Sequence, residues 1–286
     1  MLRIPLLFLA HCYRIAYRLH HRLFLQPGAP LEHATLYVIG SFRIGGAGKT
    51  PFCAWLAQKL NEGSFGKPGQ RIAILCHSKA KDEAEMLRRK FAGVPQVEVF
   101  TTSNRYRTAH ELDRHFDIIL CDDGFEDSRL TGAITIRLDR GTTPCKVGDL
   151  VPAGLNRSLE QDHDKPALIL EEPDVVFRID SVRNSNGDTC PENPDCTLCG
   201  IGSPERFIED LASRGIRPAR HITLPDHSTY LGQRLSKLLS QGNSVVITEK
   251  DSARLTSQIL KNPQVYVAYQ ETVVSASAQR AISALF

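Results

Sequence analysis

Three adjacent residues, Gly48, Lys49 and Thr50, are of the types that end a phosphate-binding loop. They belong to the stretch RIGGAGKTP, in which Arg43 occupies the place of the first glycine of the usual G-x-x-x-x-G-K-[ST] pattern. Glycines let backbone N–H groups converge on an anion, and a following helix adds the positive end of its dipole. We therefore predict an ATP-binding loop made of Ile44, Gly45, Gly46, Ala47, Gly48, Lys49 and Thr50. The alternative is a strand-to-helix turn that uses glycine for close packing.

The polar residues of this loop have expected roles. Lys49 would reach the β- and γ-phosphates, and the Thr50 hydroxyl would bind Mg²⁺. Two acids, Asp122 and Asp123, end the apolar run IILCDD, as the Mg²⁺-side element of such nucleotide sites does. We predict that Asp122 holds the metal with Thr50, and that one acid of the pair orients or deprotonates an attacking hydroxyl. The alternative is that one of them only caps the turn at Gly124.

The elements around these residues indicate an α/β fold. The unbroken apolar run at 34–40 predicts a buried strand, and 51–60 predicts a helix, so the loop lies between them. Further strands are expected at 71–77, 97–100, 117–127 and 133–139, and helices at 81–92 and 105–116. This alternation predicts a P-loop kinase-like parallel sheet domain with helices on both faces and a ligand at the carboxyl edge of the sheet.

The second half of the chain predicts a second, smaller α/β domain. Strands are expected at 167–170, 175–180, 197–202, 219–224, 244–251 and 264–270, and helices at 204–215 and 229–242. We predict four segments: an N-terminal helix within 1–30, a nucleotide-binding domain at 31–160, a linker with strands at 161–195, and a C-terminal α/β domain at 196–286.

The N-terminal stretch MLRIPLLFLAHCYRIAYRLHHRLF is basic and apolar. Its pure apolar run ends at Ala10, whereas a membrane span needs about 20 apolar residues. His11 stands where a signal peptide needs a small residue. Basic residues recur at helical spacing, and apolar ones lie on another face; these are His11, Arg14, Arg18, His21 and Arg22, and Leu9, Tyr13, Ala16, Leu19 and Leu23. We predict an amphipathic helix on an anionic membrane surface, the alternative being a helix packed on the domain with its basic face in water.

Composition limits the other possibilities. The chain has 286 residues, 42% hydrophobic and 23% charged, as expected of a globular protein with a core, and its net charge of +3 indicates no nucleic-acid partner. Most of the eight cysteines stand singly in apolar runs, which is typical of reduced, buried thiols. Cys190, Cys196 and Cys199 are closer together, but they supply only three ligands and one CxxC, a weak zinc signal. Nothing in the composition indicates an oligomeric state.

Six segments in order resemble one family. The chain from about residue 36 onward is similar to tetraacyldisaccharide 4'-kinase, the lipid A 4'-kinase of Gram-negative bacteria. In that family the phosphate loop also lacks its first glycine and is followed by proline, as by Pro51 here. The segments are VIGSFRIGGAGKTP, CDDGFEDSRL, LVPAGLNR, LCGIGSPERFIEDL, LPDHSTY and VITEKDSARL.

The resemblance implies an activity and a location. The family transfers the γ-phosphate of ATP, with Mg²⁺, to the 4'-hydroxyl of an acylated glucosamine disaccharide 1-phosphate, so we expect a peripheral enzyme on the cytoplasmic face of the inner membrane. It implies a catalytic pair, with Asp82 of KDE matching the acid of the family's GDE and His227 of DHS matching its DHH. A carboxylate that orients an imidazole near a hydroxyl is suitable base chemistry. Without the resemblance, His227 would be interpreted as a loop histidine and Asp82 as a solvated helix-start residue.

Several positions depart from the family pattern. Arg43 replaces Thr or Ser, Ser41 replaces Asn, and the segment 77–83 is short. On the acceptor side, Glu126 replaces Gln, Ser158 replaces an acid and Ser228 replaces the second His. These changes leave two alternatives open: a kinase that acts on another glycolipid, and an ATP-binding protein without turnover.

Overall fold

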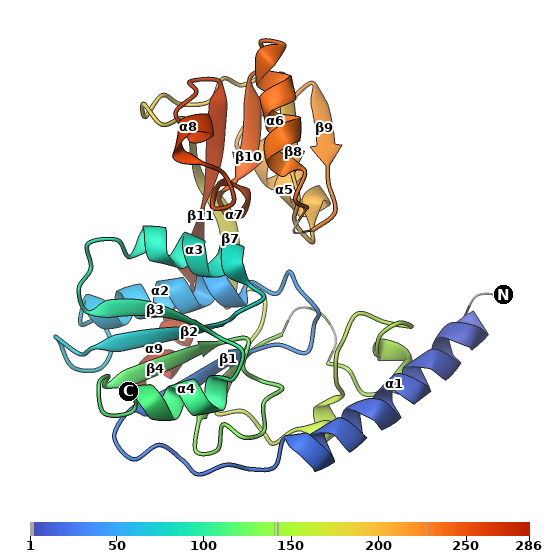
Figure 1. Ribbon diagram of the computed structural model, residues 1–286, viewed down its shortest axis with the longest axis vertical. Coiled ribbons are helices and arrows are strands. Elements are labelled where there is room, and N and C mark those ends of the chain that lie inside the picture. The colour runs from blue at the N-terminus through green and yellow to red at the C-terminus, as the bar shows by residue number, and fades with distance from the viewer. Residues whose placement is uncertain (1–2, 140, 142, 227) are drawn as a thin grey trace. The chain divides into compact units, whose positions relative to one another are not determined.

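The computed structural model describes residues 3–139, 141, 143–226 and 228–286 (Figure 1). By their contacts the described residues divide into two compact units. The first contains Met1–Lys81, Phe91–Val176 and Val274–Phe286, and the second contains Asp82–Lys90 and Phe177–Val273. Each unit is built around its own sheet.

The first unit confirms the predicted parallel sheet. Its six strands lie in the order β3-β2-β4-β1-β5-β6, and every pairing is parallel. Their bounds are β1 Thr35–Gly40, β2 Ile72–His77, β3 Val97–Thr102, β4 Ile118–Asp122, β5 Ile134–Leu138 and β6 Leu168–Leu170. Strand β1, which leads into the glycine-rich loop, lies between β4 and β5, so the paired acids at the end of β4 follow the strand next to the loop.

Helices cover both faces of this sheet. Alternate residues of β1 point to opposite sides, so Leu36 and Val38 join a buried cluster that includes Ala109 of α4 (Arg105–Leu112). Helix α2 (Lys49–Asn61) lies on the other face (Figure 1). On that second face, Tyr37 donates a hydrogen bond to the Leu285 carbonyl at 2.7 Å and stacks on Phe286.

Two elements of the first unit differ from the predicted boundaries. Strand β6 lies within the predicted linker but pairs with β5 as an edge strand of the first sheet. Helix α9 (Ala276–Ser283) was not expected, and it belongs to the first unit although it lies at the C-terminal end. It begins where the Ser275 side chain accepts a hydrogen bond from Ala278 N. The units therefore do not divide the chain at 160 and 195, because the last helix packs with the first sheet.

The second unit is the smaller α/β unit. Its sheet has the order β7-β11-β10-β8-β9, with bounds β7 Val175–Arg183, β8 Cys196–Cys199, β9 Arg220–Thr223, β10 Val245–Thr248 and β11 Val265–Val274. Helix α6 (Leu231–Ser240) and helix α5 (Pro204–Ser213) contribute to two separate apolar clusters, which also take alternate residues Val245 and Val246 of β10. The two helices therefore cover opposite faces of this sheet.

Short helices complete the second unit. They are α3 (Lys81–Lys90), α7 (Glu249–Ser252) and α8 (Ser257–Leu260). The strand predicted at 244–251 ends at Thr248, whose side chain accepts a hydrogen bond from Asp251 N and so begins α7. Cys196 packs in one apolar cluster and Cys190 and Cys199 in the other, so the three thiols do not share one site.

The N-terminal helix α1 (Arg3–Phe24) belongs to the first unit and packs on the rest of it along one stripe. Ala10 is fully buried against Leu150 and Leu159, next to the two short turns η1 (Val147–Asp149) and η2 (Glu160–Asp162). Within the described part of the chain, no helix combines the length and apolar character needed to cross a membrane.

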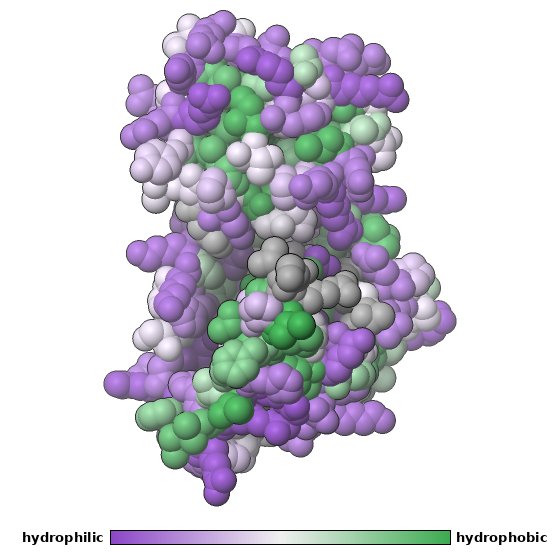
Figure 2. Space-filling view, turned by 90° about the vertical axis from the view of Figure 1, so that its right-hand side faces the viewer, coloured by the Kyte–Doolittle hydropathy of each residue, from purple (hydrophilic) through white to green (hydrophobic). Residues whose placement is uncertain are grey.

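The predicted faces of α1 were partly wrong. Tyr13 lies half-buried against the cluster that contains Ala10, and His21 is half-buried with its ring centroid 4.2 Å from that of Tyr17. Leu19 and Leu23 are exposed, as the prediction required. They form one stripe with Ile4, Phe8 and Ile15, and these five side chains are 54–79% exposed. Figure 2 views the molecule from the side of the N-terminal end of α1 and shows hydrophobic side chains exposed among hydrophilic ones in its lower part.

Candidate functional site

The glycine-rich loop, residues 44–50, has the backbone that its glycines permit. Gly45, Gly46 and Gly48 have φ values of 69°, 68° and 80°, a left-handed region that side chains disfavour. Gly48 is the N-cap residue of α2, so the helix begins at Lys49, two residues before its predicted start. The loop therefore ends on a helix N-terminus, where backbone N–H groups are available for an anion.

A neighbouring segment fixes the entrance of this loop. Ile44 N donates to the Leu155 carbonyl at 2.9 Å, and Arg157 N donates to the Phe42 carbonyl at 2.9 Å. Arg43 forms an antiparallel bridge with Asn156 between these two bonds. Arg43, which departs from the loop pattern, is therefore part of a short backbone pairing rather than of the glycine turn itself.

Thr50 and Asp122 meet at the base of the loop. The Thr50 hydroxyl donates to Asp122 Oδ2 at 2.7 Å, and both residues are buried. Hydroxyl and carboxylate oxygens are the ligands that Mg²⁺ takes beside phosphate oxygens and water. Among the described residues, no group of three His, Cys, Asp or Glu side chains is placed to hold a metal alone. The Thr50–Asp122 pair suits a magnesium ion that also binds nucleotide phosphates.

Asp123 lies beside the loop lysine. Its Oδ1 is 3.2 Å from Lys49 Nζ, and Arg157 Nη1 donates to both of its oxygens at 3.0 Å. Burial raises the pKa of this carboxyl, but the Lys49 and Arg157 cations together lower it by more. The net pKa is therefore below its usual value. Its carboxylate oxygens contact these cations, which does not support the alternative that this acid only caps the turn at Gly124.

Asp123 also has an unusual backbone. Among the residues described, it is the one non-glycine residue with positive φ, at 59°. A non-glycine residue in this region costs roughly 1–3 kcal/mol unless its surroundings hold it. Its N–H donates to the Ile39 carbonyl at 3.0 Å, at the end of β1. In this left-handed conformation the Asp123 carboxylate contacts Lys49.

Two arginines complete the site, and neither was among the predicted site residues. Arg157 contacts Asp123, and Arg105 Nη2 donates to the Asp122 carbonyl at 3.1 Å. Arg157 carries a signal in the sequence, because it stands in the LVPAGLNR segment that resembles the family. Arg105 starts an ordinary amphipathic helix, so its position beside the acids depends on the order of strands in the sheet.

A polar cluster connects α1 to the segment after the paired acids. Glu126 accepts hydrogen bonds from Tyr17 of α1 and from Ser158, the latter at 2.8 Å. His163 Nε2 lies 2.8 Å from Ser158 Oγ and 3.2 Å from the Tyr17 hydroxyl. Burial raises the pKa of Glu126 and lowers the pKa of His163 to about 4, so it favours the neutral form of each group. Glu126 and Ser158, two of the departures from the family pattern, are therefore direct partners.

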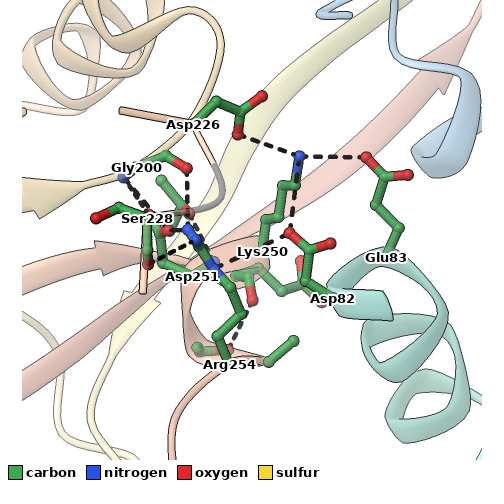
Figure 3. A network of polar contacts seen from close by, with 12 residues as sticks. Asp82, Glu83, Gly200, Asp226, Ser228, Lys250, Asp251 and Arg254 are labelled. Atoms are coloured by element: carbon green, nitrogen blue, oxygen red, sulfur yellow. Dashed lines mark hydrogen bonds and ion pairs between the residues drawn. The ribbon is translucent and has the colours of Figure 1, made fainter. Parts of the chain in front are cut away.

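The structure places Asp82 in the second unit, at the start of α3. It is 6% exposed, so it is not the solvated residue expected without the resemblance. Its Oδ2 lies 3.8 Å from Lys250 Nζ and 4.0 Å from Arg254 Nε (Figure 3). His227 lies outside the described residues, but its neighbours Asp226 and Ser228 belong to the same unit and the same network.

The fold and this site define an α/β protein with a glycine-rich loop between a strand and a helix and with paired acids beside the loop. A model of the Tetraacyldisaccharide-1-P 4'-kinase family matches residues 2–286, and this chain belongs to that family.

Curated relatives carry the same family name, and a solved structure has a similar fold. The chain is 27% identical to Tetraacyldisaccharide 4'-kinase of Chlamydia trachomatis serovar D, over 83% of this chain and 76% of that protein. It is 28% identical to the same-named protein of Halorhodospira halophila, over 80% and 75% of the two chains. The crystal structure of LpxK from Aquifex aeolicus in complex with ATP is similar in fold over 100% of both chains, with a TM-score of 0.68 and 19% identity.

Proposed function

We propose that this chain is a kinase that transfers the γ-phosphate of ATP to the 4'-hydroxyl of tetraacyldisaccharide 1-phosphate, in lipid A biosynthesis. The family match over residues 2–286 carries this conclusion. The contacts of Lys49 with Asp123 and of Thr50 with Asp122 support it, because they bring a P-loop cation and a metal-binding pair of oxygens to one place.

The chemistry follows from positioning and charge. The acceptor oxygen forms a bond to the γ-phosphorus while the bond from that phosphorus to the β–γ bridging oxygen breaks, and ADP leaves. The loop N–H groups and Lys49 stabilise charge on the phosphate oxygens, and Asp123 and Arg157 hold the Lys49 ammonium in place. Thr50 and Asp122 would hold Mg²⁺, which when bound neutralises negative charge on the phosphates.

The acceptor hydroxyl must also lose its proton. We assign this step to His227, with Asp82 orienting its imidazole, as the family resemblance implies. Asp82 and both residues that flank His227 lie in one network of the second unit, which supports this pairing. A neutral imidazole accepts the hydroxyl proton as the oxygen attacks, and the carboxylate stabilises the imidazolium that results.

Helix α1 supplies the attachment to the membrane. Its exposed apolar stripe, Ile4, Phe8, Ile15, Leu19 and Leu23, lies on the side away from the stripe that packs on the first unit. Arg22 is exposed beside it, so the helix offers apolar side chains to acyl chains and a cation to anionic headgroups. We propose that the enzyme is peripheral on the cytoplasmic face of the inner membrane, where its lipid substrate lies.

The direct test is the transfer of radiolabelled phosphate from ATP to tetraacyldisaccharide 1-phosphate. We expect the native chain to label the lipid and Lys49→Ala to lose at least about 100-fold of that rate, since the cation acts on the transferred group. Lys59→Ala is the matched control, because Lys59 lies on the same helix and pairs with nearby Glu62, away from the loop. Preferential labelling of another acylated disaccharide would mean that the chain is a kinase for another glycolipid. Binding of ATP without transfer would mean that it is an ATP-binding protein without turnover.

A further inference from the structure

One lysine of the second unit connects elements that are distant in sequence (Figure 3). Lys250 Nζ lies 3.2 Å from Glu83 Oε1, 3.5 Å from Asp226 Oδ1 and 3.8 Å from Asp82 Oδ2. Asp82 and Glu83 form the first turn of α3, and Asp226 directly precedes His227. A single ammonium therefore links the start of α3 to the segment that contains His227.

A second cation contacts the other side of that segment. Arg254 Nη1 donates to the Ser228 carbonyl at 3.3 Å, and its Nε lies 4.0 Å from Asp82 Oδ2. Lys250 and Arg254 thus contact the residues immediately before and after His227, and both approach Asp82. The two contacts hold Asp226 and Ser228, which flank His227 in the sequence.

The cations themselves come from a well-fixed element. Asp251 is fully buried; its carboxylate accepts hydrogen bonds from Gly200 N at 3.1 Å and from the Thr248 hydroxyl at 2.8 Å, and it pairs with Arg254. Gly200 also accepts from Arg254 Nη2 at 2.9 Å, and a Cβ at Gly200 would lie 3.1 Å from that nitrogen. These contacts fix Arg254 directly, and they fix the backbone of α7, to which Lys250 belongs.

Burial makes it costly to leave any of these charges without a partner. The side chains of Lys250, Arg254 and Asp82 are 22%, 15% and 4% exposed. Burial lowers the pKa of Lys250, but Glu83, Asp226 and Asp82 raise it more, so the net pKa is above its usual value and the amine stays charged at neutral pH. Removing the cation would leave several carboxylates close together without it.

We propose that Lys250, assisted by Arg254, is a positioning residue that holds Asp82 and the residues flanking His227 in the arrangement needed to deprotonate the acceptor hydroxyl. This inference rests on the proposed function, because it concerns the pair assigned there to the proton. Lys250 acts through Asp82 and His227 and touches no reacting atom in this assignment. Displacement of a base by about 1 Å is enough to cost roughly 100-fold in rate.

The test compares Lys250→Met with Lys250→Arg, which keeps the charge, and with Lys237→Met, a control at an exposed lysine of α6. We expect Lys250→Met to lower kcat about 10- to 100-fold and to change the KM for Mg-ATP by less than about twofold, because the nucleotide contacts remain. Hydrogen exchange in peptides covering 224–230 and the start of α3 should become faster. Lys250→Arg should recover most of both properties, and Lys237→Met should change neither.

Other results would overturn the proposal. A loss of kcat without faster exchange would mean that Lys250 acts directly, and a native-like kcat with native exchange would mean that it positions nothing. Asp226→Asn removes one partner at a more exposed site, so it tests the same link if Lys250→Met does not fold. If the native chain transfers no phosphate at all, the proposed function fails, whereas the exchange measurement still tests the link.

Discussion

At the scale of single residues, Asp123 shows how the site is assembled. Its left-handed backbone places a carboxylate between Lys49 and Arg157, an arrangement that an extended residue at the end of β4 would not give. Asp122, one residue earlier, remains in the strand and meets the Thr50 hydroxyl. Two adjacent acids therefore serve two different partners, one a cation and the other a hydroxyl next to the expected metal.

His163 should make stability depend on pH. Its pKa is lowered to about 4 mainly by burial, and it is faced by Glu126, Tyr17, Ser158 and Asp162. Between the ordinary pKa of 6.5 and about 4, the unfolded chain binds a proton that the folded chain does not, so the free energy of unfolding should fall as pH falls through this window. The histidine accounts for up to about 3 kcal/mol of that fall.

The measurement is urea unfolding of the native chain and of His163→Gln from pH 7 to pH 4. Burial raises the pKa of Glu126, so this carboxyl makes the folded chain more stable as pH falls toward its ordinary pKa of 4.5, opposite to the effect of His163. Both proteins keep Glu126, so the difference between their curves reports on the histidine. The native chain should lose more stability than the variant over this window. Parallel curves for the two proteins would show that His163 does not titrate in this way.

The contact between Glu126 and Ser158 predicts coupling between two departures from the family pattern. Ser158→Glu should place a second carboxylate beside Glu126 and destabilise the fold, whereas Glu126→Gln/Ser158→Glu returns the site to one carboxylate. In a double-mutant cycle measured by urea unfolding, we expect a coupling free energy of about 1–3 kcal/mol. If the two substitutions changed the free energy of unfolding additively, the side chains at 126 and 158 would not be coupled.

At the scale of elements, α1 has two faces with different roles. One stripe is anchored to the first unit by Ala10, by Tyr17 on Glu126 and by Arg18, whose Nη2 lies 2.6 Å from Asp162 Oδ1. The apolar stripe on the other side is left exposed. Since the side chains of the first stripe already contact the rest of the first unit, the exposed stripe is the part available to a lipid surface.

The exposed stripe predicts the effect of two substitutions. Ile15→Ser with Leu19→Ser should weaken binding to vesicles that contain anionic phospholipid by at least about tenfold, because two apolar side chains no longer enter the acyl region. Co-sedimentation with such vesicles measures this, and Mg-ATP affinity should be unchanged. His20→Ser, at another exposed position of α1, is the control. Equal binding of all three proteins would contradict the role given to this face.

At the scale of the whole molecule, the chain contributes Asp82–Lys90 to the second unit and then returns to the first. It leaves the first unit again within β7, returns at the end of β11, and closes the first unit with α9. Tyr37 of β1 contacts both Leu285 and Phe286, so the end of the chain supports the strand that leads into the glycine-rich loop. The stability of the nucleotide site is therefore linked to the last residues of the sequence.

Helix α9 offers a test of this link. Ile282 is fully buried, and Ile282→Ala should lower the stability of the first unit by about 2–4 kcal/mol through the cavity that it leaves. Thermal unfolding, measured with and without Mg-ATP, should show a lower melting temperature and a smaller stabilisation by Mg-ATP. Ser283→Ala, at an exposed neighbouring position, should change neither. Unchanged protection by Mg-ATP in the Ile282 variant would show that α9 does not support the site.

The sequence predicted the local elements well because their signals are local. Apolar runs gave the strands, and GGAGKT with the acids of IILCDD gave the loop and its partners. Features that depend on distant contacts were not predictable: α9 joins the first sheet, the packed face of α1 takes Tyr13 and His21, and Glu126 meets Ser158. The end of β10 at Thr248 was also missed, because a capping side chain and not hydrophobicity determines where the strand stops.

The most direct test of the account is calorimetric titration of the native chain with ATP, with and without Mg²⁺, beside Lys49→Ala and Thr50→Val. If residues 44–50 enclose the triphosphate and Asp122 shares its magnesium with Thr50, the native chain binds Mg-ATP, Lys49→Ala loses most of the affinity, and Thr50→Val loses the gain that Mg²⁺ gives. A native chain that releases no heat with Mg-ATP, or two variants that bind it as the native chain does, would contradict the account.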